Sequence, residues 1–149
     1  MALINVANLK PGGMGSLGGD QLEWLEDDLK GRPSSQPIVV FAHMPLWTVY
    51  ADWGWGTDDA AQALSHLKRF GSVTVLNGHI HQITQKVEGN IAFHTARSTA
   101  FPQPVGGQGP SPGPLKAPAG QLRSMLGITT ATLVRGHAPI ALIDQTLAT

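Results

Sequence analysis

The chain has 149 residues, of which 42% are hydrophobic and 13% are charged, enough for one domain with a buried core but short for two. Ten basic residues balance ten acidic ones, and no basic run is longer than Lys68-Arg69, which argues against a nucleic-acid polymer or an anionic membrane as partner. There is no cysteine, which excludes disulfides and thiolate metal sites.

No apolar stretch approaches the roughly 20 residues of a membrane span, and the start of the chain lacks a charged segment leading into a cleavage site. We therefore expect a soluble protein without a signal peptide or a transmembrane segment. The sequence does not indicate its compartment.

Strand-like and helix-like patterns alternate in the first half of the chain. Apolar runs predict three strands, at residues 2–9, 38–43 and 73–77. Leucine stripes predict two helices, at residues 20–30 and 57–70. This order is typical of an α/β fold, in which helices cover a sheet and ligands bind at the carboxyl ends of the strands.

The ends of both helices are predicted from single residues. Asp20 and Thr57 are of the types that cap helix N-termini, and Gly31 and Gly71 are expected to stop the two helices.

The second half of the chain has a different pattern. Residues 82–88 and 90–97 predict a β-hairpin around Gly89-Asn90. Six prolines and four glycines make residues 102–118 a loop, and a short helix and two final strands are expected after it, at 121–126, 128–134 and 140–147. We treat residues 1–149 as a single domain.

Residues 13–18 match G-x-G-x-x-G between a strand and a helix, which is where a dinucleotide site would place it. That site also needs an acidic residue at the end of the next strand, whereas this strand ends in His43-Met44-Pro45. The spread of the glycines suits a flexible connection better, and we reject the dinucleotide interpretation.

Histidines follow two of the predicted strands. His79 and His81 come after Gly78, and strand alternation would project both to the same side. Gly78 lets the backbone come close to a bound group, and His43 closes a second apolar run. A lone strand-end histidine usually bonds to backbone or water, but the three together predict a site for divalent metal ions such as Mn, Zn or Fe.

The loop at 45–59 is rich in aromatic residues: Trp47, Tyr50, Trp53 and Trp55. They form either a small hydrophobic cluster under a long loop or the lining of a substrate site.

Three segments, 15–25, 40–46 and 77–81, together resemble the second half of a calcineurin-like metallophosphoesterase. The resemblance covers residues 3–97 well and the remainder loosely. It implies a truncated form of that fold, a partial β-sandwich covered by helices, whose metal ions activate a water that attacks phosphorus.

Carried over by position, the resemblance makes His43 and His79 ligands of one ion and His81 a ligand of the other, with His79 and His81 at the catalytic centre. The family's N-terminal half, with its D-x-H, bridging aspartate and G-N-H segments, has no counterpart here.

Several sources could replace the missing ligands. The chain's own candidates are Asp52, Asp58, Asp59 and His94, and three imidazoles alone could hold a single zinc ion. A second chain is another source, because half a sandwich would expose an apolar sheet face. We therefore expect a homodimer or a higher homo-oligomer.

The sequence thus favours a metal-dependent phosphodiesterase or phosphatase acting on a small phosphate ester. In that enzyme Trp47, Tyr50 and Trp53 would stack on an aromatic group of the substrate. The alternative is a catalytically inactive half-domain that binds a metal or a partner and needs a complementary chain.

Four further polar residues have less specific roles. Arg97 could contact a phosphate oxygen or be solvated, and Asn77 could orient the loop after the strand. His66 and His137 are expected to be structural or solvated.

Overall fold

The structure is a computed structural model that describes residues 2–3, 6–7, 12–136 and 140–148. In chain order the elements are β1 (Ala2–Leu3), β2 (Val6–Ala7), β3 (Gly15–Ser16), α1 (Gly19–Leu29), β4 (Ile38–Ala42), η1 (Ala51–Trp53), α2 (Ala60–Leu67), β5 (Val73–Asn77), β6 (Thr84–Glu88), β7 (Ile91–Thr95), α3 (Ala119–Met125), β8 (Gly127–Thr132) and β9 (Ala141–Thr146).

A mixed sheet in the order β1-β4-β5-β7-β6 forms the centre of the molecule. The first four strands of this order are parallel, and β6 joins the edge antiparallel to β7. β2 and β3 pair with each other, as do β8 and β9. The chain is therefore an α/β protein, as its sequence predicts.

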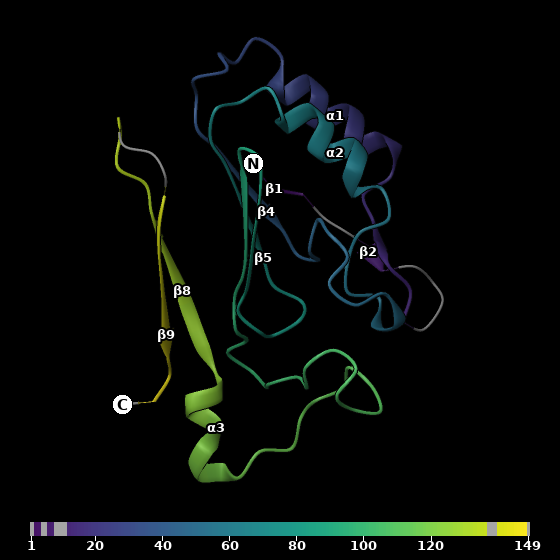
Figure 1. The fold of residues 1–149 in the computed structure, drawn as a ribbon, viewed down its shortest axis with the longest axis vertical. Coiled ribbons are helices and arrows are strands. Elements are labelled where there is room, and N and C mark those ends of the chain that lie inside the picture. The colour runs from purple at the N-terminus through teal and green to yellow at the C-terminus, as the bar shows by residue number, and fades with distance from the viewer. Residues whose placement is uncertain (1, 4–5, 8–11, 137–139, 149) are drawn as a thin grey trace.

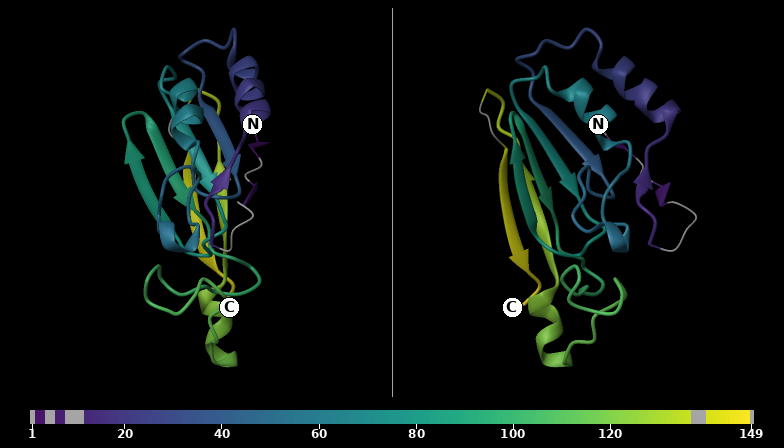
Figure 2. Two further views of the ribbon diagram at one scale, coloured as in Figure 1. Left: turned by 90° about the vertical axis from the view of Figure 1, so that its right-hand side faces the viewer. Right: turned by 45° about the vertical axis from the view of Figure 1, so that its right-hand side comes forward.

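The two faces of the central sheet have different covers. α1 and α2 lie side by side on one face, and the β8–β9 hairpin lies on the other (Figures 1 and 2). The helix-covered face holds most of the core. In β4, Ile38, Val40 and Ala42 are buried there, and Leu25 of α1 and Leu67 of α2 are in the same cluster.

The opposite face, called the outer face below, is only partly covered. Phe41, Leu76 and His94 lie side by side across β4, β5 and β7 on it. His94 is buried, but the Phe41 side chain is 53% exposed. The hairpin contacts this face through Asp144, whose Oδ1 lies 3.0 Å from His94 Nε2.

Most predicted elements are present. The two helices, the β6–β7 hairpin around Gly89, the short helix and the closing pair of strands all form. Within the expected strand over 2–9 the structure describes two short strands, of which β1 joins the central sheet and β2 pairs with β3, and residues 4, 5, 8 and 9 lie outside the described residues.

Gly31 follows the C-cap Lys30 of α1 with left-handed backbone (φ 73°), as expected for a helix stop, whereas α2 already ends at Leu67, before Gly71. The predicted N-caps are wrong. α1 has Gly18 at its N-cap and contains Asp20, and α2 has Asp59 at its N-cap. Thr57 instead donates its hydroxyl proton to the Pro45 carbonyl oxygen at 2.9 Å, because the aromatic loop passes beside it. Within the described residues, no helix has the length and hydropathy to cross a membrane.

Candidate metal centre

The carboxyl ends of β4 and β5 are tied together at the residue where each strand stops. Ala42 and Asn77 are partners in the parallel register. The Asn77 side-chain amide donates to the carbonyl oxygens of Ala42 (2.7 Å) and Met44 (3.1 Å), and Gly78 N–H donates to His43 O at 3.0 Å. These bonds hold the two histidine-bearing segments next to each other.

His43 and His79 meet at this junction. His43 Nε2 lies 3.3 Å from His79 Nδ1, and the ring centroids are 5.2 Å apart at 78°. Two imidazole nitrogens bound to one tetrahedral zinc at about 2.0–2.1 Å are separated by roughly 3.3 Å. The same separation allows a hydrogen bond between the two neutral rings. The spacing therefore fits either a metal ion bound by both nitrogens or a direct hydrogen bond between them.

His79 and His81 do not lie in a strand, which corrects the argument from strand alternation. β5 ends at Asn77, and the backbone φ angles of His79 and His81 are 64° and 56°. Left-handed backbone in a non-glycine residue costs about 1–3 kcal/mol and is concentrated at functional sites. The bend after the strand, rather than the pleat, sets the direction of both rings.

His81 has a defined tautomer. Its Nδ1 lies 2.7 Å from the Phe101 carbonyl oxygen, and a carbonyl oxygen only accepts hydrogen bonds, so Nδ1 carries the proton and Nε2 keeps its lone pair. A histidine that binds a metal through one nitrogen usually donates its other N–H to such a group.

Burial, followed by the neighbouring His43 and His81, lowers the pKa of His79 from 6.5 to about 4. The ring is therefore neutral at neutral pH, which is the form that binds metal ions.

His94 is held away from this pair. Its Nδ1 lies 3.1 Å from Gln85 Nε2 and its Nε2 lies 3.0 Å from Asp144 Oδ1, so both ring nitrogens have partners on the outer face. Thr129 also donates to Asp144 Oδ1, at 2.6 Å. In the structure His94 connects the sheet to the hairpin.

The candidate carboxylates are dispersed. Asp52, on η1, and Asp58 are both exposed. The pKa of Tyr50 is raised by burial of its hydroxyl and by the nearby Asp52 carboxylate. Across residues 12–136 and 140–148, no group of three His, Asp or Glu side chains is placed to hold one ion.

Asp59 has a structural role that sequence reasoning missed. Its carboxylate accepts bonds from Leu17 N–H (2.9 Å), Gly18 N–H (2.8 Å) and the Ser16 hydroxyl (3.0 Å). The amides of the G-x-G-x-x-G segment therefore bind an internal anion, and the segment is not the flexible connection expected. A short polar residue just before a helix indicates an N-cap, but the Asp59 side chain makes no cap bond to α2, so no local signal in the sequence pointed to this role.

The aromatic loop is a packed cluster in the structure. Trp55 is buried, and Trp53 lies 5.2 Å from Tyr50 and 5.1 Å from Trp55 between ring centroids. A Cβ at Gly106, in the proline-rich loop, would lie 3.0 Å from Tyr50 Cγ. Trp47 packs on Phe93 at 5.0 Å. These contacts favour the hydrophobic-cluster interpretation of the loop.

Two other predicted substrate-binding residues have structural partners. Arg97 donates to the Ser124 carbonyl oxygen at 2.7 Å and so holds the C-terminal end of α3, and Asn77 ties β5 to the segment after β4. His66 is on α2, and His137 lies outside the described residues.

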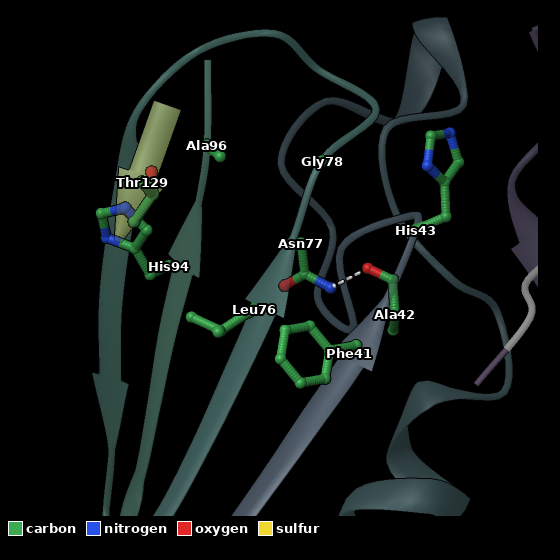
Figure 3. Close-up of a pocket in the computed structure, with 9 residues that line it drawn as sticks. All are labelled: Phe41, Ala42, His43, Leu76, Asn77, Gly78, His94, Ala96 and Thr129. Carbon is green, nitrogen blue, oxygen red and sulfur yellow. Dashed lines mark hydrogen bonds between the residues drawn. The ribbon is translucent and has the colours of Figure 1, made fainter. Parts of the chain in front are cut away.

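A cavity of about 360 Å³ opens beside the junction, on the outer face. Its described lining residues, shown in Figure 3, are Phe41, Ala42, His43, Leu76, Asn77, Gly78, His94, Ala96 and Thr129. Sequence reasoning missed it, because a cavity depends on where the hairpin docks.

No protein-family model matches the chain, and no curated protein is found to be similar to it.

Proposed function

We propose that this chain hydrolyses small phosphate esters, with a divalent metal ion held by His43 and His79. The 3.3 Å separation of His43 Nε2 and His79 Nδ1 carries the proposal, because it matches the spacing of two ligands on one tetrahedral ion. A divalent ion bound there would neutralise phosphoryl oxygens and lower the pKa of its bound water.

The chain's own residues fix the geometry of this site. Gln103 Nε2 donates to the His79 carbonyl oxygen at 3.2 Å, and the Phe101 carbonyl fixes the ring of His81. His81 thereby presents the lone pair of Nε2, which can bind a second ion or accept a proton from water or substrate. Gln103 lies at the start of the loop 102–118, and Phe101 is the residue just before it.

The fold proposed for this function is the truncated calcineurin-like metallophosphoesterase suggested by the sequence. Its support is the arrangement of a mixed sheet with helices on one face and a β-hairpin on the other, with histidines following two adjacent parallel strands. Because no further His, Asp or Glu among the described residues completes a group of three, water, substrate or another chain would supply the remaining metal ligands.

The exposure of the outer face favours a second candidate function, a half-domain that acts with a complementary chain. Phe41 on β4 and Val87 on β6 are 53% and 75% exposed. For the enzyme, a homodimer or higher homo-oligomer that covers this face could also bring in carboxylate ligands.

Activity is tested on bis(4-nitrophenyl) phosphate with added Mn²⁺ or Zn²⁺, before and after removal of the ion by EDTA. His43→Ala and His79→Ala should each lower turnover at least 100-fold, whereas His66→Ala on α2 serves as the matched control and should retain it. Full turnover in His79→Ala, or full turnover in EDTA, would contradict the proposal.

The two candidates are separated by measuring mass in solution together with metal content. A particle of two chains that hydrolyses the ester supports the enzyme. A monomer that binds metal without hydrolysis supports the half-domain.

A further inference from the structure

Another cavity, of about 640 Å³, opens between the loop 102–118 and α3. These two segments lie next to each other at one end of the molecule (Figure 2). The described wall of the cavity contains one arginine, Arg97, and no aspartate or glutamate. The cavity therefore has one permanent positive charge that no carboxylate in its described wall neutralises.

The Arg97 side chain is held in place at its end and along its stem. Its Nη1 donates to the Ser124 carbonyl oxygen at 2.7 Å. Its Cδ passes so close to Gly127 that a Cβ built on that glycine would lie 3.2 Å from it. Because the side chain is already ordered, it loses less conformational entropy on binding a ligand than a freely moving arginine would.

One edge of the Arg97 guanidinium is available to a ligand. Among the described residues, its Nε and Nη2 have no hydrogen-bond partner, and no carboxylate forms an ion pair with it. Nε–H and Nη2–H point the same way on one edge of the planar group, and such a pair matches two oxygens of a carboxylate or phosphate. The free edge is thus a bidentate donor for an anion.

Apolar side chains share the cavity with this arginine. Ile83, Val105 and Leu115 are 38%, 52% and 39% exposed, and all three line the cavity. Contact of such side chains with water is unfavourable, and burial under an apolar ligand is favourable. The wall therefore combines one charged donor with an apolar surface.

Two other polar side chains of the wall already have partners within the chain. Gln82 Nε2 donates to the Pro104 carbonyl oxygen at 2.6 Å, and the Ser124 hydroxyl donates to the Gln121 carbonyl oxygen at 2.7 Å. A negatively charged group in the cavity is therefore directed to Arg97.

We propose that this cavity is a binding site for an organic anion, a molecule with one carboxylate or phosphate group on an apolar body. The anionic group binds the Nε–Nη2 edge of Arg97, and the apolar body covers Ile83, Val105 and Leu115. A neutral molecule of the same shape binds more weakly, because it removes water from the guanidinium without replacing the lost hydrogen bonds equally well. Binding needs no metal ion, so the site stands apart from the proposed hydrolysis.

The test uses three probes of similar shape: 4-tert-butylbenzoate, 4-tert-butylphenylphosphonate and the neutral 4-tert-butylbenzamide. Each is titrated into the full chain, freed of metal by EDTA and then of EDTA by dialysis, and followed by amide NMR shifts. At least one anion should bind about tenfold more tightly than the benzamide, and the tighter anion identifies the preferred head group. The shifts should be largest at residues 81–83, 97, 105, 115 and 124.

Removal of the charge tests the role of the guanidinium. Arg97→Gln should weaken binding of the tighter anion about tenfold and leave binding of the benzamide unchanged. Arg123→Gln, at an exposed position on α3, is the matched control and should bind all three probes as the wild type does.

A second pair of variants leaves the bond between Arg97 and Ser124 intact. Val105→Glu adds a negative charge to the wall and should also weaken binding of the anion, whereas Val87→Glu, on exposed β6, should not. Circular dichroism checks that each variant is folded. Benzamide binding as tight as that of both anions, undiminished anion binding in folded Arg97→Gln or Val105→Glu, or no anion binding to the wild-type chain would each overturn the proposal.

Discussion

The two faces of the central sheet use the same strands for different purposes. The face under α1 and α2 is closed by a continuous cluster of buried aliphatic and aromatic side chains. The outer face is covered by a two-stranded hairpin, leaves Phe41 half exposed and retains a cavity. Stability is therefore concentrated on the helix-covered face, and the candidate binding features are at the outer face and at the strand ends.

The comparison can be tested with two phenylalanines that lie on opposite faces. Phe93 is 2% exposed under the helices and Phe41 is 53% exposed on the outer face. Phe93→Ala should lower the free energy of unfolding by about 3–5 kcal/mol, and Phe41→Ala by less than about 1 kcal/mol. Urea denaturation measures both, and equal losses would show that the outer face is as tightly packed as the other.

The attachment of the hairpin can be broken at Asp144. Asp144→Ala leaves His94 Nε2 and the Thr129 hydroxyl without their partner, and should destabilise the docked hairpin by about 1–3 kcal/mol. Hydrogen exchange of the β8 and β9 amides should accelerate while exchange in β5 is unchanged. Thr130→Ala, at an exposed position on β8, is the control, and unchanged exchange in Asp144→Ala would show that other contacts hold the hairpin.

Asp59, next to α2 on the helix-covered side, is expected to give a smaller change in stability. Its burial raises the pKa, but the bonds from Leu17, Gly18 and Ser16 outweigh this effect and lower the pKa below its usual 3.8. The carboxylate thus stabilises the fold above pH 3.8, and this stability is lost as pH falls through the lowered value. Asp59→Asn should lower the free energy of unfolding by about 1 kcal/mol at neutral pH, a value that already allows for the partial exposure of the carboxylate.

NMR titration of the Asp59 carboxyl carbon and denaturation at several pH values measure this effect. The exposed Asp58→Asn is the matched control. A titration midpoint above the usual value for aspartate would contradict the account.

His79 predicts a pH dependence of stability. Its pKa is about 4 in the folded chain and 6.5 in its ordinary environment. Between pH 6.5 and pH 4 the unfolded chain takes up a proton that the folded chain does not, so stability should fall as the pH is lowered through this window.

His79→Asn should remove that part of the pH dependence, because asparagine does not titrate and tolerates the left-handed backbone. The measurement is urea denaturation in EDTA at pH 7, 5.5 and 4.5. An identical pH profile in the variant would contradict the lowered pKa.

Local signals in the sequence predicted much of the fold. The leucine stripe in α1 and the glycine turn before Asn90 are local features, and both elements formed where they were expected. The proximity of His43 and His79 was also predictable, because strands separated by one helix tend to be parallel neighbours.

The rest depends on contacts between distant segments. The left-handed backbone of His79 and His81 lies in a loop held by Phe101 and Gln103, which are 20 and 24 residues away from the residues they contact. The Asp59 carboxylate accepts hydrogen bonds from a segment that lies some 40 residues earlier in the chain. Residue types alone do not specify such partners, which is why the strand-based argument for the two histidines failed.

Zinc titration of the metal-free chain by calorimetry tests the central claim most directly. The wild type and the His66→Ala control should bind Zn²⁺ with the same affinity, while His43→Ala and His79→Ala should each bind at least tenfold more weakly. Equal affinity in all four proteins would show that the His43–His79 junction is not the metal site.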